Sequence, residues 1–207
     1  MKKAIVLFFF CTTAFSFSIQ LVDKNSEHID ETIAEILKVQ QTLLLPLELT
    51  EIPSCAQSGF LTVQMTPQYL IEFLQTGRFL IAVHQDQIVG YLLLDQIEQY
   101  LHWAEGKRFD SEWDLQTLQT MGYIDQIAVA REFAKQGVGT ALINSAKKLS
   151  ERGLLTDILS APYRNEASLR FFTARGFANI GTMYIEQTAT SPPHATAVML
   201  WLPSTEH

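Results

Sequence analysis

The sequence predicts an α/β (α+β) domain in which a mixed, mostly antiparallel sheet of about seven strands is flanked by helices. Three observations lead to this class. The apolar run 123–129 passes through a short polar loop into an amphipathic helix that opens at Val138. The runs 79–83 and 88–94 are rich in β-formers and are joined by four polar residues, as in an antiparallel hairpin. Strand-like and helix-like segments alternate along the rest of the chain.

Composition fits one globular domain. The chain has 207 residues, of which 47% are hydrophobic and 18% charged, and it contains neither an evident linker nor an internal repeat. The formal net charge of −7 gives no electrostatic footprint for nucleic acid or for an anionic membrane. It would favour a cationic partner such as an amine, although solubility alone also explains an acidic surface.

Cysteines and histidines give no sign of a metal site or a disulfide framework. Cys11 and Cys55 are the two cysteines, and the five histidines are scattered without ligand spacing. We therefore assign no residue to a metal.

The first sixteen residues have the layout of a secretory signal peptide. Lys2 and Lys3 precede the apolar run 4–10, and small residues follow. This run is too short to span a bilayer as a helix, so no stable membrane span is expected. We divide the chain into residues 1–16, a signal peptide or N-terminal extension, and a single domain over 17–203.

The first half of the domain is expected to begin with a strand over 18–22. A helix capped by Asn25 or Ser26 follows, with its apolar residues from Ile29 onward on one face. After a connecting segment over 43–60, Thr66 and Pro67 are typical of a helix start, and Gly77 of a helix end.

The segment between Asp95 and Gly122 is polar but rich in aromatic residues. Tyr100 and Trp103, together with Trp113, are candidates to line a substrate pocket. The alternative is a short amphipathic helix whose aromatic rings pack on the sheet.

The second half of the domain is expected to close the sheet. A strand over 154–160, a helix over 165–175 and two strands over 177–185 and 195–202 are predicted.

The loop before the helix at Val138 has the features of an anion site. Gly137 and Gly139 lack the Cβ atoms that would keep a ligand away from the backbone. The free N–H groups of the first helical turn could then bind a phosphate group. The residues concerned are Gln136, Gly137, Val138, Gly139, Thr140 and Ala141.

This hexapeptide resembles the Gln/Arg-x-x-Gly-x-Gly/Ala signature of the GNAT superfamily of N-acetyltransferases. A second match runs from Asn165 through the aromatic pair at 171–172 to Gly176 and Phe177. The resemblance extends from about Ser18 to Leu202. It implies the GNAT fold and transfer of an acetyl group from acetyl-CoA to a primary amine, with neither a metal nor a covalent enzyme intermediate.

The resemblance also implies roles for the cofactor-binding residues. The glycine loop would hold the pyrophosphate, and the backbone of Ile127, Ala128 and Val129 would hold the pantetheine arm. The N–H of Ala128 or Val129 would stabilise the oxyanion. Asn165 would contact the cofactor, and a helix cap is its compatible alternative role.

Asp125 is the candidate general base. Strand alternation would place its carboxylate on the same face as the side chains of Ile127 and Val129. The alternative is a structural carboxylate paired with an Arg or a backbone donor, and Glu98, Glu105 and Glu132 are weaker candidates for the base.

Phe172 stands where many members of the family have a proton-donating tyrosine, and we expect its ring beside the cofactor's sulfur. Tyr163, Tyr184 or water would then protonate the leaving thiolate.

The acceptor stays open: a small amine, a polyamine, an amino acid, or a protein N-terminus or lysine would each be consistent. A non-catalytic acyl-CoA-binding or interaction module is the rival function. Acetyl-CoA chemistry favours the cytoplasm, whereas residues 1–16 favour export, for instance as an acetyltransferase effector. Whether the chain forms a homodimer is also open.

Overall fold

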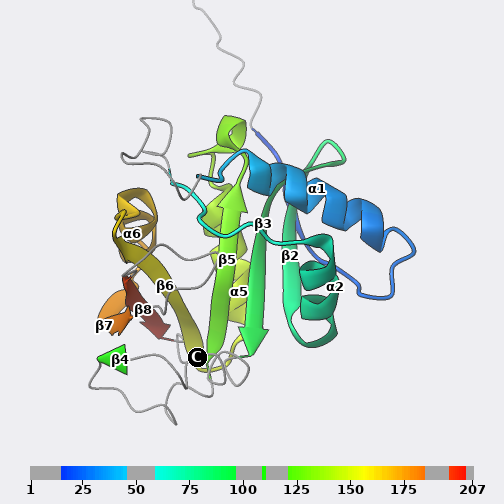
Figure 1. Ribbon diagram of the computed structural model, residues 1–207. Helices are drawn as coiled ribbons and strands as arrows, with labels where there is room; N and C mark the ends of the chain where they lie inside the picture. Colours follow the sequence, from blue (N-terminus) through cyan, green and yellow to red (C-terminus); the bar gives the residue numbers. More distant parts are fainter. Residues whose placement is uncertain (1–14, 46–58, 97–108, 111–120, 185–195, 204–207) are drawn as a thin grey trace, which may run out of the picture.

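The computed structural model describes residues 15–45, 59–96, 109–110, 121–184 and 196–203. Its centre is one sheet of eight strands in the order β1-β2-β3-β5-β6-β8-β7-β4 (Figure 1). Neighbouring strands are antiparallel except for β5 and β6, which are parallel. The predicted mixed, mostly antiparallel sheet is therefore confirmed. The strands are β1 (Ser18–Leu21), β2 (Arg78–His84), β3 (Gln87–Gln96), β4 (Phe109–Asp110), β5 (Gly122–Val129), β6 (Gly153–Ala161), β7 (Ala178–Tyr184) and β8 (Thr196–Pro203).

Four α-helices cover the two faces of this sheet in the described part of the chain. Helices α1 (Ile29–Gln41) and α2 (Pro67–Thr76) lie in front of it in Figure 1, and α5 (Val138–Leu149) lies behind β3 and β5. Helix α6 (Glu166–Thr173) follows β6 and contributes Phe172 to the same apolar cluster as α5.

Each face has its own apolar core. The core on the α5 side is built around Leu142, Ile143 and Phe172, whereas the core on the α1 and α2 side is built around Ile36, Leu70 and Tyr91. Two separate cores explain why strand residues of both parities are apolar in β3, which is buried on both faces.

The hairpin and the start of α2 follow their predicted turn chemistry. Gln85 and Asp86 both have positive φ, at 48° and 62°, as a tight two-residue hairpin turn requires. Thr66 caps α2 by accepting a hydrogen bond from the N–H of Tyr69, and Gly77 is its C-cap.

The expected cap of α1 is wrong. Its N-cap is His28, whose side chain makes no capping hydrogen bond. The Ser26 hydroxyl instead accepts from the N–H of His28 in the preceding turn. A short polar residue two positions upstream therefore stabilises the turn before the helix rather than the helix itself.

Residues that precede β1 already pack against the rest of the domain. The Phe15 ring lies 4.5 Å from the His84 ring and 5.5 Å from the Phe133 ring, measured between centroids. The N-terminal backbone is also held, since the carbonyl of Ser16 lies 2.5 Å from Nδ1 of His84.

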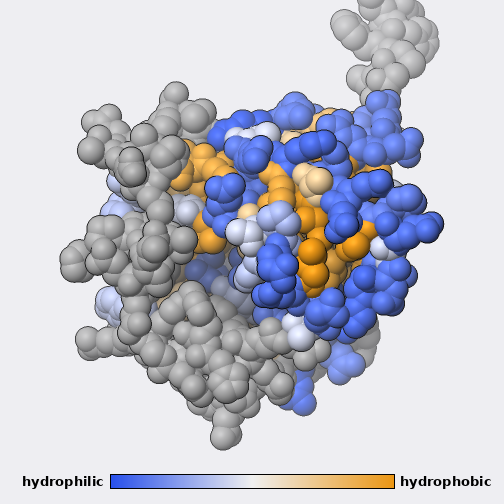
Figure 2. Space-filling view, turned by 45° about the vertical axis from the view of Figure 1, so that its right-hand side comes forward, coloured by the Kyte–Doolittle hydropathy of each residue, from blue (hydrophilic) through white to orange (hydrophobic). Residues whose placement is uncertain are grey.

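Seen from the side of α1 and α2, the described surface is mostly hydrophilic, with a band of apolar residues between the polar ones (Figure 2). None of the helices over the described ranges is long and apolar enough to cross a bilayer.

Candidate functional site

The candidate site lies at a fork, the place where the two parallel strands β5 and β6 stop pairing and diverge. β5 and β6 pair only from Gly122 with Leu154 to Ile124 with Thr156, although both strands continue for several residues. At the last paired position, the Thr156 hydroxyl donates a hydrogen bond of 3.1 Å to the carbonyl of Ile124. Beyond it the strands diverge, and a cleft of about 1430 Å³ lies there.

The cleft has two dissimilar halves. One is lined by the loop before α5 and by α6, and the other by residues 59–66, the start of α2 and Asp125. The cationic side chains among the described lining residues, Lys135, Arg170 and Arg175, all belong to the first half. The lining carboxylates, Asp125 and Asp157, belong to the strands of the fork.

The loop before α5 exposes the start of a twelve-residue helix. Two left-handed residues turn the chain there, Lys135 with φ 61° and Gly137 with φ 89°. A Cβ atom on Gly137 would meet no heavy atom within 4 Å, so the space over the first turn is open. The N–H groups of that turn have no acceptor within the helix, which suits an anion.

Gly139 is required for a different reason. A Cβ atom there would lie 2.9 Å from the Phe171 ring, so the missing side chain makes room for α6 and not only for a ligand. The Arg175 guanidinium lies 3.6 Å from the centroid of that ring and donates to the hydroxyl of Thr140. Arg175 thereby places a positive charge at the first turn of α5.

The backbone of β5 presents alternate N–H groups to the cleft. Ala130 donates to the carbonyl of Val89 on β3 over 2.9 Å, and the antiparallel register pairs Ala128 with Tyr91. Alternation then directs the N–H of Ala128 toward β3 and those of Ile127 and Val129 toward the diverging β6 side.

Asp125 occupies a β-bulge, and this corrects its expected orientation. Leu93 pairs with Gln126 and Leu94 with Ile124, so Asp125 is the extra residue of β5. Ile124 and Ile127 both pack in the α5-side core, although they are three positions apart. Asp125 therefore does not share a face with Ile127 and Val129, because the bulge reverses the alternation. Its carboxyl group interacts with Tyr69 of α2 on the other face.

Asp125 is half-buried, and one of its carboxyl oxygens lies in an environment that disfavours charge. Its Oδ2 atom is buried and has no hydrogen-bond partner. Burial, followed by the charges of Asp157 and Asp95, raises the pKa of Asp125 to about 7, and the hydrogen bond with Tyr69 acts in the opposite direction. A carboxyl group of this pKa can exchange a proton near neutral pH.

Residues 59–66 form the wall of the cleft opposite β5, and hydrogen bonds of buried side-chain amides hold this wall in place. Gln126 accepts from Nε2 of Gln40 over 3.1 Å and from the hydroxyl of Tyr91. Gln40 in turn accepts from the N–H of Met65 over 3.1 Å. This network fixes the chain just before α2, and with it the position of Tyr69.

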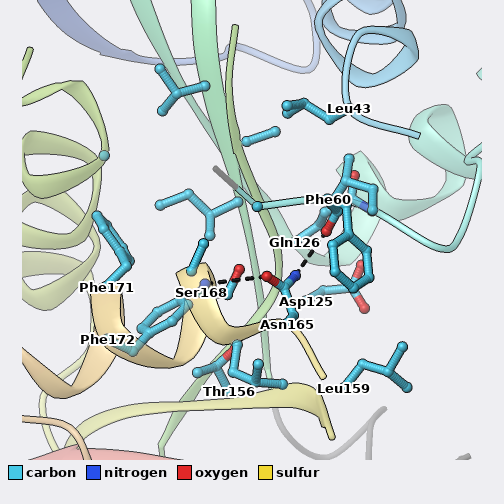
Figure 3. Close-up of a pocket in the computed structure, with 18 of the residues that line it drawn as sticks. Leu43, Phe60, Asp125, Gln126, Thr156, Leu159, Asn165, Ser168, Phe171 and Phe172 are labelled. Atoms are coloured by element: carbon cyan, nitrogen blue, oxygen red, sulfur yellow. Dashed lines mark hydrogen bonds between the residues drawn. The ribbon is translucent and has the colours of Figure 1, made fainter. Parts of the chain in front are cut away.

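Asn165, at the start of α6, hydrogen-bonds to the same wall of the cleft (Figure 3). Its Nδ2 donates to the carbonyl of Phe60 over 2.9 Å, and its Oδ1 accepts from the N–H of Ser168. The helix-cap role considered for Asn165 is thus observed, and both ends of its amide are engaged within the protein. It also lines the cleft, and a contact with a cofactor stays a prediction.

The remaining predicted site residues fall into two groups. Phe172 is 1% exposed, lies edge-on to Phe171 and Phe177, and lines the cleft. By contrast, Tyr163 packs against Leu45, Phe60 and Leu159 and is not among the lining residues.

Several predicted residues take no part in the cleft wall or cannot be placed. Gln136 points back to the carbonyl of Glu132, Ala141 continues the helix by donating to the carbonyl of Gly137, and Tyr184 is exposed. The candidates that lie outside the described residues are Glu98, Tyr100, Trp103, Glu105 and Trp113.

Sequence reasoning missed several cleft residues, among them Tyr69, Asp157 and Arg175. Asp157 stands in a predicted strand whose other residues are mostly apolar, and this is the signal that could have singled it out. Over the described ranges, no three His, Cys, Asp or Glu side chains come together in a way that could hold a metal ion.

Comparison with known protein families identifies one family. A model of the acetyltransferase (GNAT) family matches residues 47–177, more than half of the chain. The comparison with curated protein sequences gave no match.

Two solved structures with TM-scores above 0.5 show the same fold. The N-acetyltransferase from Staphylococcus aureus Mu50 is 15% identical with a TM-score of 0.57, and the alignment covers 92% of this chain and 99% of that one. The ribosomal-protein-S18-alanine N-acetyltransferase from Escherichia coli is 11% identical with a TM-score of 0.57, covering 93% and 96%. A proposed streptothricin acetyltransferase from Bacillus anthracis str. Ames, solved in complex with acetyl coenzyme A, is 21% identical with a TM-score of 0.45, and the match covers 62% of each chain.

Proposed function

The chain belongs to the acetyltransferase (GNAT) family, and from this premise we propose that it transfers an acetyl group from acetyl-CoA to a primary amine. The observation that carries the proposal is the division of charge in the cleft. Cationic side chains lie beside an open helix start in one half, and a carboxylate with one buried oxygen lies in the other. Such a cleft suits an anionic donor of the acetyl group and a cationic acceptor.

The residues of the first half, hereafter the donor half, fit the phosphates of acetyl-CoA. The open space over Gly137 leaves the first N–H groups of α5 accessible, and the helix dipole favours a negative group there. Lys135 and Arg175 add positive charge at the same loop. Bound there, acetyl-CoA would supply an activated thioester whose pantetheine arm follows the exposed edge of β5.

In the second half, hereafter the acceptor half, Asp125 is proposed to accept a proton of the acceptor's ammonium group. The amine nitrogen then forms a bond to the acetyl carbonyl carbon, the carbon–sulfur bond breaks, and the thiolate of CoA leaves. After the attack, the nitrogen loses a second proton, which restores the thiol, and Asp125 releases the first proton to solvent, so no other reactant is needed. A base with a pKa of about 7 matches this task at neutral pH.

The N–H of Val129 is the proposed donor to the negative charge that develops on the acetyl oxygen. It faces the diverging side of the fork, whereas the N–H of Ala128 is directed to β3. A pre-positioned donor of this kind typically contributes about 100- to 1000-fold to kcat. For protonation of the thiolate, Tyr163 stays a candidate beside water, and Tyr69 and Tyr123 are the tyrosines that line the described cleft.

The proposed function is tested by following free thiol released from acetyl-CoA with and without a panel of primary amines, together with calorimetric titration of CoA. We expect CoA to bind and thiol to appear only when an amine is present. Binding without amine-dependent release would favour the non-catalytic acyl-CoA-binding module instead.

We further propose that residues before Phe15 form an extension to a single transferase domain that ends near Pro203. Phe15 packs on His84 and Phe133 of this domain, so cleavage after Ser16 would remove a ring from the fold. The need for acetyl-CoA favours the cytoplasm, and export is the alternative. Deletion of residues 1–14 tests the boundary: the shortened chain should keep the Tm and the activity of the full chain.

A further inference from the structure

The acceptor half of the cleft has an uncharged and mostly apolar wall, residues 59–66. The apolar residues of this wall that line the cleft are Phe60, Leu61, Val63 and Met65. Resting on the proposed acetyl transfer, we propose that the acceptor is a primary amine with an apolar body, an alkyl chain or an aromatic ring. Its ammonium group would bind at Asp125, and its body would pack against this wall.

One carboxyl oxygen of Asp125 marks the place of the ammonium group. Asp125 lines the cleft, and its Oδ2 atom is buried and has no hydrogen-bond partner within the described part of the chain. A buried carboxylate oxygen without a donor is costly, because its desolvation is not compensated. An ammonium group of the acceptor would supply both the donor and the opposite charge.

The wall itself offers no charge to a second polar group of the acceptor. Residues 59–66 contain no charged side chain. The cations among the described lining residues, Lys135, Arg170 and Arg175, belong to the donor half, and the lining carboxylate Asp157 comes from β6 and accepts from the Tyr123 hydroxyl. A charged group on the body of the acceptor would lose water against the wall without gaining an opposite charge there, which opposes binding.

Apolar side chains that are exposed in the free protein gather at this half. Over the described ranges, four large hydrophobic side chains are exposed, and two of them line the cleft: Val63 at 44% and Tyr69 at 41%. The buried Leu43 and Phe60 line it as well, together with Asp125 (Figure 3). Exposed apolar surface beside a single polar group is typical of a site that takes an amphipathic small molecule.

The backbone of the wall is largely engaged within the protein. The carbonyl of Phe60 accepts from Asn165, and both the N–H and the carbonyl of Leu61 pair with the segment 43–45. The N–H of Met65 donates to a buried glutamine amide. A peptide acceptor, whose own N–H and C=O groups need partners, would find these positions occupied. Contacts from this wall therefore come mainly from its side chains, which favours an apolar body over a peptide.

A series of straight-chain amines tests the proposal on the full-length protein: aminoethane, 1-aminobutane and 1-aminohexane. Each offers the same primary amine, and only the length of the apolar body changes. We expect kcat/KM to rise about fourfold for each methylene group that becomes buried, so that 1-aminohexane exceeds aminoethane by about tenfold or more. Equal kcat/KM values across the series would overturn the proposal.

The acceptor 6-amino-1-hexanol separates apolar burial from chain length. It has the carbon chain of 1-aminohexane, but its far end is a hydroxyl group that loses water against an apolar wall. We expect its kcat/KM to fall below that of 1-aminohexane by about threefold or more. A hydroxylated acceptor that is used better than 1-aminohexane would contradict an apolar site.

The variant Val63→Thr places the apolar body on the wall. Threonine keeps the branched shape of valine and replaces one methyl group by a hydroxyl, and the exposed position makes misfolding of the variant unexpected. We expect the ratio of kcat/KM for 1-aminohexane to that for aminoethane to fall about threefold or more. Leu21→Thr is the matched control, because Leu21 is 54% exposed but does not line the cleft, and it should keep the wild-type ratio.

An unaltered ratio in a folded Val63→Thr protein would contradict the placement of the apolar body on this wall. The outcomes also separate this inference from the function beneath it. Acetylation of all three amines without a preference for the longer chain would refute the inference alone. Failure to acetylate any amine would refute the acetyl transfer itself.

Discussion

The Nδ2 atom of Asn165 donates a hydrogen bond of 2.9 Å to the backbone carbonyl of Phe60, which lies 105 residues earlier in the chain. Asn165 is 7% exposed, and its Oδ1 atom simultaneously caps α6. One side chain thus joins the start of α6 in the donor half to the wall of the acceptor half.

Replacing Asn165 should separate these two roles. Asn165→Asp keeps an oxygen that can cap α6 but loses the donor to Phe60, so we expect KM for the amine to rise. Asn165→Ala loses both bonds and should also destabilise the fold by about 1–3 kcal/mol. Steady-state kinetics and denaturant unfolding measure the two effects. An Asp variant with an unchanged amine KM would show that the link to Phe60 does not position the acceptor.

Asp125 should make stability depend on pH in a defined direction. Burial raises its pKa from 3.8 to about 7, so the folded protein binds this proton more tightly than the unfolded chain does. Its ionised form therefore costs stability, and this cost is absent below about pH 4, grows as the pH rises, and is complete above about pH 7. We expect Asp125→Asn to raise the Tm at about pH 8 and to leave it unchanged near pH 4.

The same variant should report on catalysis. We expect Asp125→Asn to lower kcat about 100- to 10,000-fold while the Kd for CoA stays nearly constant. In the wild type, kcat/KM should rise with pH through the region near 7 as the carboxyl group ionises. A variant that retains the wild-type pH–rate profile would establish Asp125 as a structural carboxylate.

Gly137 offers a cleaner test of the phosphate site than Gly139. At Gly139 any Cβ atom would collide with Phe171, so a substitution there disturbs packing as well as binding. Gly137→Glu instead extends a negative charge into open space over the helix start, and we expect the affinity for CoA to fall about 100-fold or more.

Gly137→Ala is the matched control, because it imposes the same left-handed backbone strain without the charge. Calorimetry of CoA binding and thermal unfolding compare the two proteins. Comparable affinities in the two variants would mean that the phosphates lie elsewhere.

We expect Phe172 to contribute mainly to the packing of the core. Because its ring is buried between Phe171 and Phe177, Phe172→Ala should cost about 3–5 kcal/mol in denaturant unfolding. Phe172→Tyr should fold, since the ring also lines the cleft, and its kcat should stay level or rise. A folded Tyr variant without turnover would show that this ring does not face the thioester.

Much of the fold could be predicted because local signals agree with the tertiary structure. The strand at 123–129, the hairpin at 79–94 and the helix at Val138 were expected within a residue or two of their observed bounds. Each has strong periodicity and a distinct turn or glycine at its end. The glycine loop was found for the same reason, since its chemistry is contained in six consecutive residues.

The acceptor half could not be predicted in this way because it depends on contacts between distant segments. A bulge between β3 and β5 turns Asp125 away from Ile127, and no single-strand pattern reveals which residue is unpaired. Tyr69 reaches the cleft only because Gln40 and Gln126 fix the chain before α2. Gly139 is expected from the sequence to make room for a ligand, whereas a Cβ atom at this position would first meet the Phe171 ring.

The most direct test of acetyl transfer follows the acetyl group itself. The full-length protein is incubated with acetyl-CoA labelled in the acetyl group and with a panel of primary amines, and the products are identified by mass spectrometry. We expect the label on the nitrogen of an amine, with one equivalent of free CoA formed for each acetylated amine. Intact acetyl-CoA, or free labelled acetate with unmodified amines, would contradict acetyl transfer by this protein.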